Sequence, residues 1–391
     1  MSEIIELEIE RILPGGVGLA HAENRTFFVT LAAPGDRVRA RVDRTQGNLS
    51  FASVVEVVLP SPVRIEPPCP YFGRCGGCDF QQLSYDAQLK AKADIIQDCL
   101  HRITKLQNVP QITVTPSPQE WRYRGRATWQ FDTTEKTIGY YERGSRKVCD
   151  VSDCAVLRPE LQAVLEQVRS TDWSNIPGDL KHLEVTASGN GSSLSPGLGD
   201  LRTDVVTVQI AREHYSYNAV AFFQANEFLL EPLLNAAIAD ASGDFAIDLY
   251  SGVGLFTIAM ARRFTKVVAV ESSTEAIRFA RANLREAELQ NAKVVSVTAT
   301  EWFRESSRKP GSVDFLLLDP PRAGAESIVI KGILDLRPAR LCYVSCDPAT
   351  LARDLKKLIA GGYELISVEA FDMFPQTHHV ETVVHLSLPR T

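Results

Sequence analysis

The chain has 391 residues, of which 45% are hydrophobic, and its formal net charge is −6. Its length suggests roughly two to three folding units, and its charge excludes indiscriminate nucleic-acid binding, which relies on a strongly basic surface. No stretch approaches the roughly 20 apolar residues of a membrane span, and MSEIIELEIE does not resemble a secretory signal. We therefore expect a soluble, cytoplasmic protein with no membrane partner.

Residues 1–60 contain short alternating segments such as IELEIE, FFVT and DRVRARV, separated by the turn sequences PGGVG and APGD. This pattern predicts a small OB-like β-barrel. In DRVRARV, a two-residue period places Arg37, Arg39 and Arg41 on one strand face. Such a face is either simply solvated or contacts phosphates.

The eight cysteines are too few for a disulfide scaffold in a chain of this size. Cys69, Cys75 and Cys78 cluster in CPYFGRCGGC, and Cys154 lies further along in VSDCAVL. Four thiolates can hold zinc or an iron–sulfur cluster, and their spacing alone does not decide between the two. Cys149 is a possible rival for the fourth ligand position.

Residues 61–217 form the predicted central α+β domain, which contains strand-like segments such as ATWQF and HLEVTA. Within it, WRYRGRATWQF alternates aromatic residues with Arg122, Arg124 and Arg126. Residues 119–149 carry seven basic and four acidic side chains. Arginine and aromatic side chains bind phosphates and unstacked bases, so we predict that these arginines contact RNA. An ordinary half-buried strand shows the same alternation.

Residues 218–391 alternate strands such as AIDLY, VVAV and LCYVS with helices, which predicts a doubly wound α/β domain. After the first strand, DLYSGVGLFT contains Gly252 and Gly254, which let a ligand approach the backbone. Thr257 stands where a dinucleotide fingerprint has its third glycine, and Glu271, at the end of the next strand, can bind both ribose hydroxyls. These features favour an adenosine cofactor without a pyrophosphate, and S-adenosylmethionine fits.

Two further polar residues follow apolar strands of this domain. Asp319 in LDPPRAG and Cys346 in VSCDP are both predicted to lie on the rim where open α/β sheets bind ligands. A thiolate at Cys346 can attack C6 of a uracil, and the adduct makes C5 nucleophilic enough to take a methyl group. Glu381 in HHVETVV is the candidate base that removes the C5 proton. An inert buried cysteine is the alternative interpretation of Cys346.

These motifs resemble those of the RNA 5-methyluracil methyltransferases, particularly the iron–sulfur type with an amino-terminal TRAM domain. The resemblance spans almost the whole chain: a TRAM-like barrel, C-x5-C-x2-C, FFQAN, DLYSGVG, LDPPR, SCDP and HVET, in this order. It implies a Rossmann-like class I methyltransferase sheet, with Cys346 as nucleophile and Glu381 as base. It also implies a [4Fe–4S] cluster on the cysteines of the cluster motif and VSDCAVL, and cofactor contacts from Gln224, Tyr250, Leu255, Glu271, Thr298 and Asp319.

The resemblance also bears on the substrate. It implies an RNA target, with 23S ribosomal RNA as the first expectation and transfer RNA as the alternative, and we expect a monomer. Thr298 stands where the family usually has an acidic residue, and His378 where it more often has glycine. Two competing hypotheses remain: a base-amino methyltransferase that uses the turn at Asp319 without Cys346, and a noncatalytic RNA-binding protein.

Overall fold

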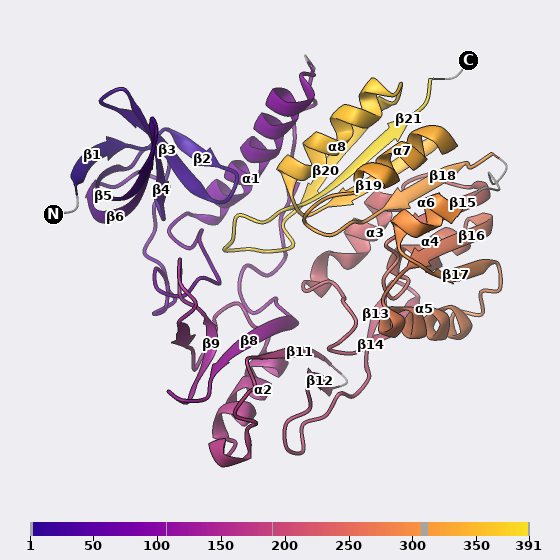
Figure 1. The fold of residues 1–391 in the computed structure, drawn as a ribbon, viewed down its shortest axis with the longest axis horizontal. Coiled ribbons are helices and arrows are strands. Elements are labelled where there is room, and N and C mark those ends of the chain that lie inside the picture. The colour runs from indigo at the N-terminus through magenta and orange to yellow at the C-terminus, as the bar shows by residue number, and fades with distance from the viewer. Residues whose placement is uncertain (1–2, 107, 190, 306–311, 390–391) are drawn as a thin grey trace.

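The fold is given by a computed structural model that describes residues 3–106, 108–189, 191–305 and 312–389. Within these ranges the strands form sheets of six, five, two and eight strands. Figure 1 shows the six-stranded sheet near the amino terminus, the five-stranded sheet below it, and the eight-stranded sheet on the carboxyl-terminal side. None of the described helices is both long and apolar enough to cross a lipid bilayer.

The amino-terminal sheet has the strand order β1-β5-β6-β4-β3-β2. Exposure alternates along β5, whose Val38 and Ala40 are fully buried, so the predicted two-residue period is confirmed. Arg37, Arg39 and Arg41 each form a salt bridge with an acidic side chain, which balances much of the charge on this face. The strands are β1 (Ile4–Glu8), β2 (Arg11–Leu13), β3 (Val17–Ala22), β4 (Arg25–Thr30), β5 (Arg37–Gln46) and β6 (Leu49–Leu59).

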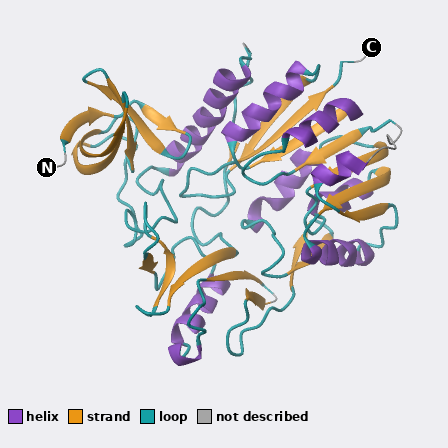
Figure 2. Cartoon of the chain, in the orientation of Figure 1, coloured by secondary structure: helices purple, strands orange, loops and turns teal. Residues whose placement is uncertain are grey.

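The central sheet has the order β10-β9-β8-β11-β12, and α2 (Pro159–Ser170) packs against it. Trp129, Leu165 and Leu183 are fully buried between the helix and the sheet. Figure 2 shows that loops make up much of this part of the chain. The remaining elements are β8 (Arg126–Asp132), β9 (Thr137–Tyr141), β10 (Val148–Asp150), β11 (His182–Ser188), β12 (Gly191–Ser195) and the 3-10 turn η2 (Trp173–Asn175).

The eight-stranded sheet has the order β17-β16-β15-β18-β19-β21-β20-β7. Strands β15 to β19 are mutually parallel, and β21 runs antiparallel to both β19 and β20. The chain therefore reverses its direction of winding between β15 and β18, as the predicted doubly wound pattern requires. The strands are β15 (Gly243–Leu249), β16 (Phe264–Glu271), β17 (Ala292–Ser296), β18 (Phe315–Leu318), β19 (Arg340–Ser345), β20 (Glu364–Phe371), β21 (Glu381–Ser387) and β7 (Val114–Thr115).

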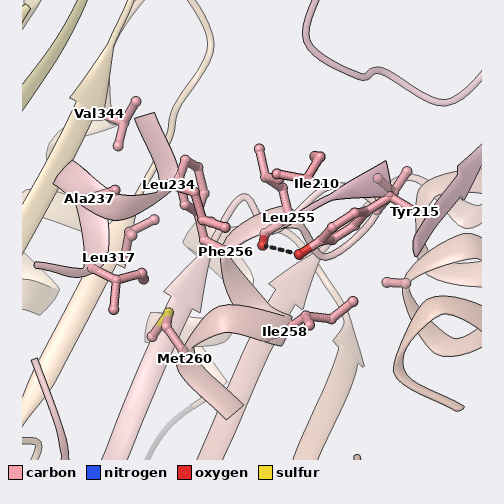
Figure 3. Packing of buried hydrophobic residues seen from close by; sticks show 14 of the residues in the cluster. Ile210, Tyr215, Leu234, Ala237, Leu255, Phe256, Ile258, Met260, Leu317 and Val344 are labelled. Atoms are coloured by element: carbon pink, nitrogen blue, oxygen red, sulfur yellow. Dashed lines mark hydrogen bonds between the residues drawn. The ribbon is translucent and has the colours of Figure 1, made fainter. Parts of the chain in front are cut away.

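Helices cover both faces of this sheet (Figure 2). Figure 3 shows one face, where Leu234 and Phe256 lie beside Leu317 and Val344 of the sheet. This face is covered by α3 (Leu230–Ile238), α4 (Leu255–Ala261) and α5 (Thr274–Glu286). The opposite face is covered by α1 (Tyr85–Cys99), α6 (Ala299–Glu305), α7 (Ser327–Leu336) and α8 (Pro348–Ala360).

The packing does not follow the predicted boundary at residue 217. Helix α1 and its extension η1 (Leu100–Thr104) belong to the predicted central domain, yet Ile95 and Ile96 pack with the eight-stranded sheet. Strand β7 joins that sheet through the pairing of Val114 with Ala370. The hairpin of β13 (Val206–Ile210) and β14 (Glu213–Tyr217) also packs there, since the Tyr215 hydroxyl donates to the Leu255 carbonyl at 3.3 Å (Figure 3).

Candidate active site

The strand directions explain why residues distant in sequence meet on one rim of the eight-stranded sheet. Asp319 follows β18 and Cys346 follows β19, so both lie at carboxyl ends of parallel strands. Glu381 begins β21, which runs antiparallel to β19, so its amino end reaches the same rim. This edge of an open α/β sheet, near the reversal of winding, is where such folds bind ligands.

The charges on this rim influence one another. Burial and then the charge of Asp319 raise the pKa of Glu381 well above its usual value, while Arg322 opposes the shift. Burial also raises the pKa of Asp319 to about 7. The pKa of Cys346 rises to about 12 through burial and the charge of Glu381, again opposed by Arg322. These four side chains therefore form one interacting group.

Arg322 was not among the residues predicted for the site. It occupies the last position of the quoted motif LDPPR, directly after the two prolines that follow Asp319. Its side chain is exposed, and its charge favours the ionised forms of both Cys346 and Glu381. The sequence could have pointed to Arg322, because it is a basic residue in the same motif as Asp319, just after the strand end.

Local structure holds Cys346 at the turn between β19 and α8. The Asp347 side chain caps α8 by accepting a hydrogen bond from the Thr350 amide at 2.8 Å, and Pro348 occupies the first turn of the helix. Cys346 is only partly buried, whereas Cys342 of β19 is completely buried. The thiol of Cys346 thus lies at the rim, whereas Cys342 is the cysteine that is buried in the core.

The turn after β15 leaves room for a ligand beside a fixed carboxylate. Gly252 has a φ of 55°, and a Cβ atom there would have no other atom within 4 Å. The Gly252 amide donates to Glu271 at 2.9 Å, and the amides of Ser272 and Ser273 donate to the other carboxylate oxygen at 2.8 and 2.7 Å. Three backbone donors therefore hold Glu271 in one orientation at the rim.

Asp248, at the end of β15, is completely buried. Burial raises its pKa to about 7, and the hydrogen bond donated by the Thr257 hydroxyl opposes this shift. Its Oδ1 atom has no hydrogen-bond partner in the part of the chain that the structure describes. A buried carboxyl oxygen without a partner is unfavourable, so it favours a donor from a ligand at this position.

The other predicted cofactor residues occupy different environments. Tyr250 has a φ of 62°, and its hydroxyl donates to the Glu326 carboxylate. The side chain of Leu255 is buried in the core shown in Figure 3. Gln224 is partly buried in the loop between β14 and the 3-10 turn η3 (Glu227–Leu229).

Thr298 has a structural role that its sequence neighbourhood already indicated. The Glu301 carboxylate accepts from the Thr298 amide at 2.9 Å and from its hydroxyl at 2.8 Å, and the Glu301 amide donates to that hydroxyl at 3.1 Å. These contacts form a capping box at the start of α6, which the T-x-x-E spacing in the sequence indicates. Val297 pairs with the Glu271 carbonyl at 3.1 Å, which brings Thr298 near the rim.

A separate cavity gathers the four predicted cluster cysteines. Cys69, Cys75, Cys78 and Cys154 all line it. The rival Cys149 does not; it is 1% exposed, and its sulfur accepts a hydrogen bond from Arg74 Nε at 3.3 Å. Among the described residues, no three Cys, His, Asp or Glu side chains gather closely enough to hold a metal ion. The ligand set for a cluster thus stays a prediction.

The three arginines of the central domain have partners within the protein. Arg122 forms two hydrogen bonds with Asp153, at 2.8 and 3.0 Å. Arg126 donates to the carbonyls of Ala221 and Ala219 at 2.8 and 2.7 Å, which fixes the loop leading to the FFQAN motif. Arg124 lines the cysteine cavity. These contacts support the fold, and the predicted RNA contacts of all three stay predictions.

Comparison with solved structures shows which proteins share this fold. The chain has a mixed α/β fold like that of class I methyltransferases. It is similar to the crystal structure of a Pyrococcus abyssi tRNA (uracil-54, C5)-methyltransferase in complex with S-adenosyl-L-homocysteine, with a TM-score of 0.75 and 24% sequence identity. The similarity covers 98% of this chain and 100% of that one, so it includes all parts of the fold.

Comparison of sequences defines the family. A family described as tRNA (Uracil-5-)-methyltransferase matches residues 198–388. An RNA methyltransferase of Halalkalibacterium halodurans is 30% identical over 99% of this chain and 97% of its own length. Another from Thermotoga maritima is 31% identical over 97% of this chain and 98% of its own length. The chain belongs to the same RNA methyltransferase family as these relatives and is an RNA methyltransferase of EC class 2.1.1.

Proposed function

We propose that the protein methylates C5 of a uridine in RNA through a covalent adduct between Cys346 and C6 of the base. One observation carries the proposal: the sheet topology gathers Cys346, Asp319 and Glu381 on one rim, although they come from three separate motifs. Only a mechanism that uses a nucleophile together with a base needs this combination. The target uridine is extruded from a helix or drawn from a loop, because two catalytic groups cannot reach the C5–C6 edge of a stacked base.

The residues account for each bond that changes. The Cys346 thiol gives its proton to solvent water, a change favoured by the charge of Arg322, and the thiolate sulfur bonds to C6. The electrons of the C5–C6 double bond then make C5 the nucleophile, and C5 takes the methyl group. Glu381 accepts the remaining C5 proton, the double bond re-forms, and the thiolate leaves C6. Asp319, which interacts with Glu381, is proposed to orient the uracil.

The rim fits S-adenosylmethionine as the methyl donor. Open space at Gly252, the fixed carboxylate of Glu271 and the unpartnered Oδ1 atom of Asp248 suit an adenosine with two ribose hydroxyls. S-adenosylmethionine, when bound, supplies an electrophilic methyl group. The residues proposed to hold it are Gln224, Tyr250, Gly252, Leu255, Glu271, Thr298 and Asp319.

We further propose a [4Fe–4S] cluster on Cys69, Cys75, Cys78 and Cys154. All four line one cavity, and four thiolates suit iron–sulfur as well as zinc, so these are the residues that would hold the cluster. With all four positions taken by cysteine, the cluster would join segments of the central domain or orient RNA. Protein purified without oxygen should be brown and absorb visible light. Stoichiometric zinc without iron would contradict this assignment.

The target is proposed to be 23S ribosomal RNA, with transfer RNA as the alternative. The support is the resemblance, since family members with both a TRAM-type barrel and a cysteine cluster often act on ribosomal RNA. We propose that the protein works as a monomer in the cytoplasm. Mapping of 5-methyluridine in RNA from cells with and without the protein would identify the target.

The covalent mechanism is tested by Cys346→Ala, with Cys342→Ala, in the strand that precedes it, as the matched control. We expect Cys346→Ala to abolish methyl transfer and adduct formation while S-adenosylmethionine still binds in calorimetry. Cys342→Ala should retain transfer because its thiol is buried in the core. Transfer by Cys346→Ala would favour a base-amino methyltransferase, and a wild-type protein that binds no S-adenosylmethionine would favour a noncatalytic RNA-binding protein.

A further inference from the structure

Residues 372–380 connect β20 to β21 and lead directly into the proposed base, Glu381. Contacts from outside the sheet hold this segment. The amide of Gln376 donates to the Gln88 side chain of α1 at 2.9 Å, and the Gln88 side chain donates back to that of Gln376 at 2.9 Å. The Tyr123 hydroxyl donates to the Pro375 carbonyl at 3.0 Å. The placement of the segment thus depends on other parts of the chain.

A further set of contacts comes from Asp79, the residue directly after Cys78. One oxygen of its carboxylate accepts from the His378 amide at 2.8 Å, and the other bonds to the His378 ring at Nδ1. The amides of Asp79 and Phe80 both donate to the Gln376 carbonyl, at 3.1 and 3.0 Å. Residues 69–80, which contain Cys69, Cys75 and Cys78, form a loop that we call the cysteine loop. Asp79 and Phe80 of this loop therefore make four hydrogen bonds with residues 372–380, two of them to a carboxylate.

The amino-terminal sheet also packs against Asp79 and His378. Gly16 lies in the turn between β2 and β3, and a Cβ atom there would come within 3.0 Å of His378 Cβ and 3.2 Å of Asp79 Oδ2. The neighbouring Gly15 would meet nothing within 4 Å. Three segments that are far apart in the sequence therefore converge on the contact between Asp79 and His378.

We propose that Asp79 and His378 are positioning residues whose contact holds residues 372–380, and with them Glu381, in the orientation that proton removal requires. This inference rests on the proposed role of Glu381 as the base. It makes the catalytic rim dependent on the cysteine loop and on the amino-terminal sheet.

The first test compares Asp79→Asn and His378→Gly with Asp98→Asn. Asp98 is a suitable control because its carboxylate also bridges elements, accepting from Arg11 of β2 at 2.9 Å, without touching residues 372–380. We expect hydrogen exchange of the amides in 372–380 to become at least about tenfold faster in the first two variants and to stay unchanged in the control. Exchange like that of the wild type in Asp79→Asn would overturn the inference.

The second readout separates positioning from general destabilisation. In Asp79→Asn, the ratio of methylated covalent adduct to released product should rise, because addition and transfer proceed while proton removal slows. Its affinity for S-adenosylmethionine should match that of the wild type. A loss of cofactor affinity in parallel with activity, without adduct, would show a merely structural role. If the wild type forms no adduct at all, the proposed function fails, and the exchange experiment still decides whether the contact orders the segment.

A glycine pair provides a third comparison within the turn of the amino-terminal sheet. Gly15 and Gly16 have φ values of 86° and 74°, so alanine at either position carries similar backbone strain. Only Gly16→Ala would displace the contact, so it should reproduce the faster exchange and adduct accumulation of Asp79→Asn. Equal behaviour of Gly15→Ala and Gly16→Ala would argue against coupling through this turn.

Discussion

Asp319 and Glu381 bring two carboxyl groups to one rim of the sheet, and burial together with the charge of Asp319 raises the pKa of Glu381. Only the ionised form of Glu381 can accept a proton, so a raised pKa moves the onset of base catalysis to higher pH. The ionised fraction, and with it the rate of adduct resolution, should rise with pH. Arg322 counteracts part of this shift, because its positive charge favours the ionised carboxylate.

Asp319→Asn should therefore move the pH profile of adduct resolution to lower pH. The substitution removes the neighbouring negative charge, which lowers the pKa of Glu381 while its burial persists. The measurement is single-turnover release of tritium from C5 of labelled RNA as a function of pH. The overall rate should also fall, because Asp319 is proposed to contact the cofactor and the uracil. If the rate of tritium release rose over the same pH range in Asp319→Asn as in the wild type, the two carboxyl groups would not interact.

Glu381→Gln should trap a methylated covalent complex between protein and RNA. The amide retains the size of the side chain but cannot accept the C5 proton, so addition and methyl transfer proceed and elimination stops. Loss of a general base typically slows a reaction by about 10²–10⁴-fold. Denaturing gels with RNA and cofactor labelled separately would reveal the complex and show that it carries the methyl group. Free product at the wild-type rate would contradict the assignment of Glu381.

Arg322→Gln should make Cys346 less reactive. Burial and the charge of Glu381 already raise the pKa of Cys346 to about 12, and Arg322 is the neighbour that favours the thiolate. Without its charge the pKa rises further, so less thiolate is present at any pH. Alkylation of Cys346 by iodoacetamide, followed by mass spectrometry at several pH values, should slow in the variant. The double variant Arg322→Gln with Glu381→Gln should recover part of the lost rate.

The rim was readable from the sequence because β18 and β19 are short apolar runs, each followed by a polar residue. Asp319 and Cys346 mark two such ends, and parallel strands bring their ends to one edge. Strand β7 was not predictable, because two residues carry no periodic pattern. The contact between Asp79 and His378 spans 299 positions, and nothing in the local sequence of either residue points to the other.

Side-chain partners were the least predictable feature. The alternation around Arg126 indicated a half-buried strand and, equally, an RNA-binding surface. The structure shows that this guanidinium binds two backbone carbonyls of a loop more than 90 residues away. The cap at Thr298 could, in contrast, have been predicted, because the spacing of Thr298 and Glu301 is that of a capping box, which depends only on local sequence.

Thr298→Ala should destabilise the protein through the loss of this cap. The hydroxyl of Thr298 accepts from the Glu301 amide, and removal of an N-cap side chain costs about 1 kcal/mol. Thr298→Ser keeps the hydroxyl and serves as the control. Chemical denaturation would measure the stability of both variants, and calorimetry their affinity for S-adenosylmethionine. A stable Thr298→Ala variant with weakened cofactor binding would instead show that the residue serves mainly as a ligand contact.

Lys92 and Asp372 form an ion pair whose two side chains are completely buried, and the ammonium group of Lys92 also donates to the Phe374 carbonyl at 3.1 Å. Lys92→Met should therefore destabilise the protein by about 3–5 kcal/mol, because it leaves the carboxylate of Asp372 buried without its counter-charge. The double variant Lys92→Met with Asp372→Leu removes both charges and should regain much of this loss.

The neighbouring pair on the same helix provides the control for that measurement. Lys90 and Asp94 interact at 2.6 Å, but their side chains are 74% and 57% exposed. Water screens such a pair, so Lys90→Met should cost no more than about 1 kcal/mol. Denaturation of the three variants beside the wild type gives the comparison. Equal losses for Lys92→Met and Lys90→Met would mean that water reaches Asp372 when Lys92 is absent, and that the buried pair does not anchor the segment leading to Glu381.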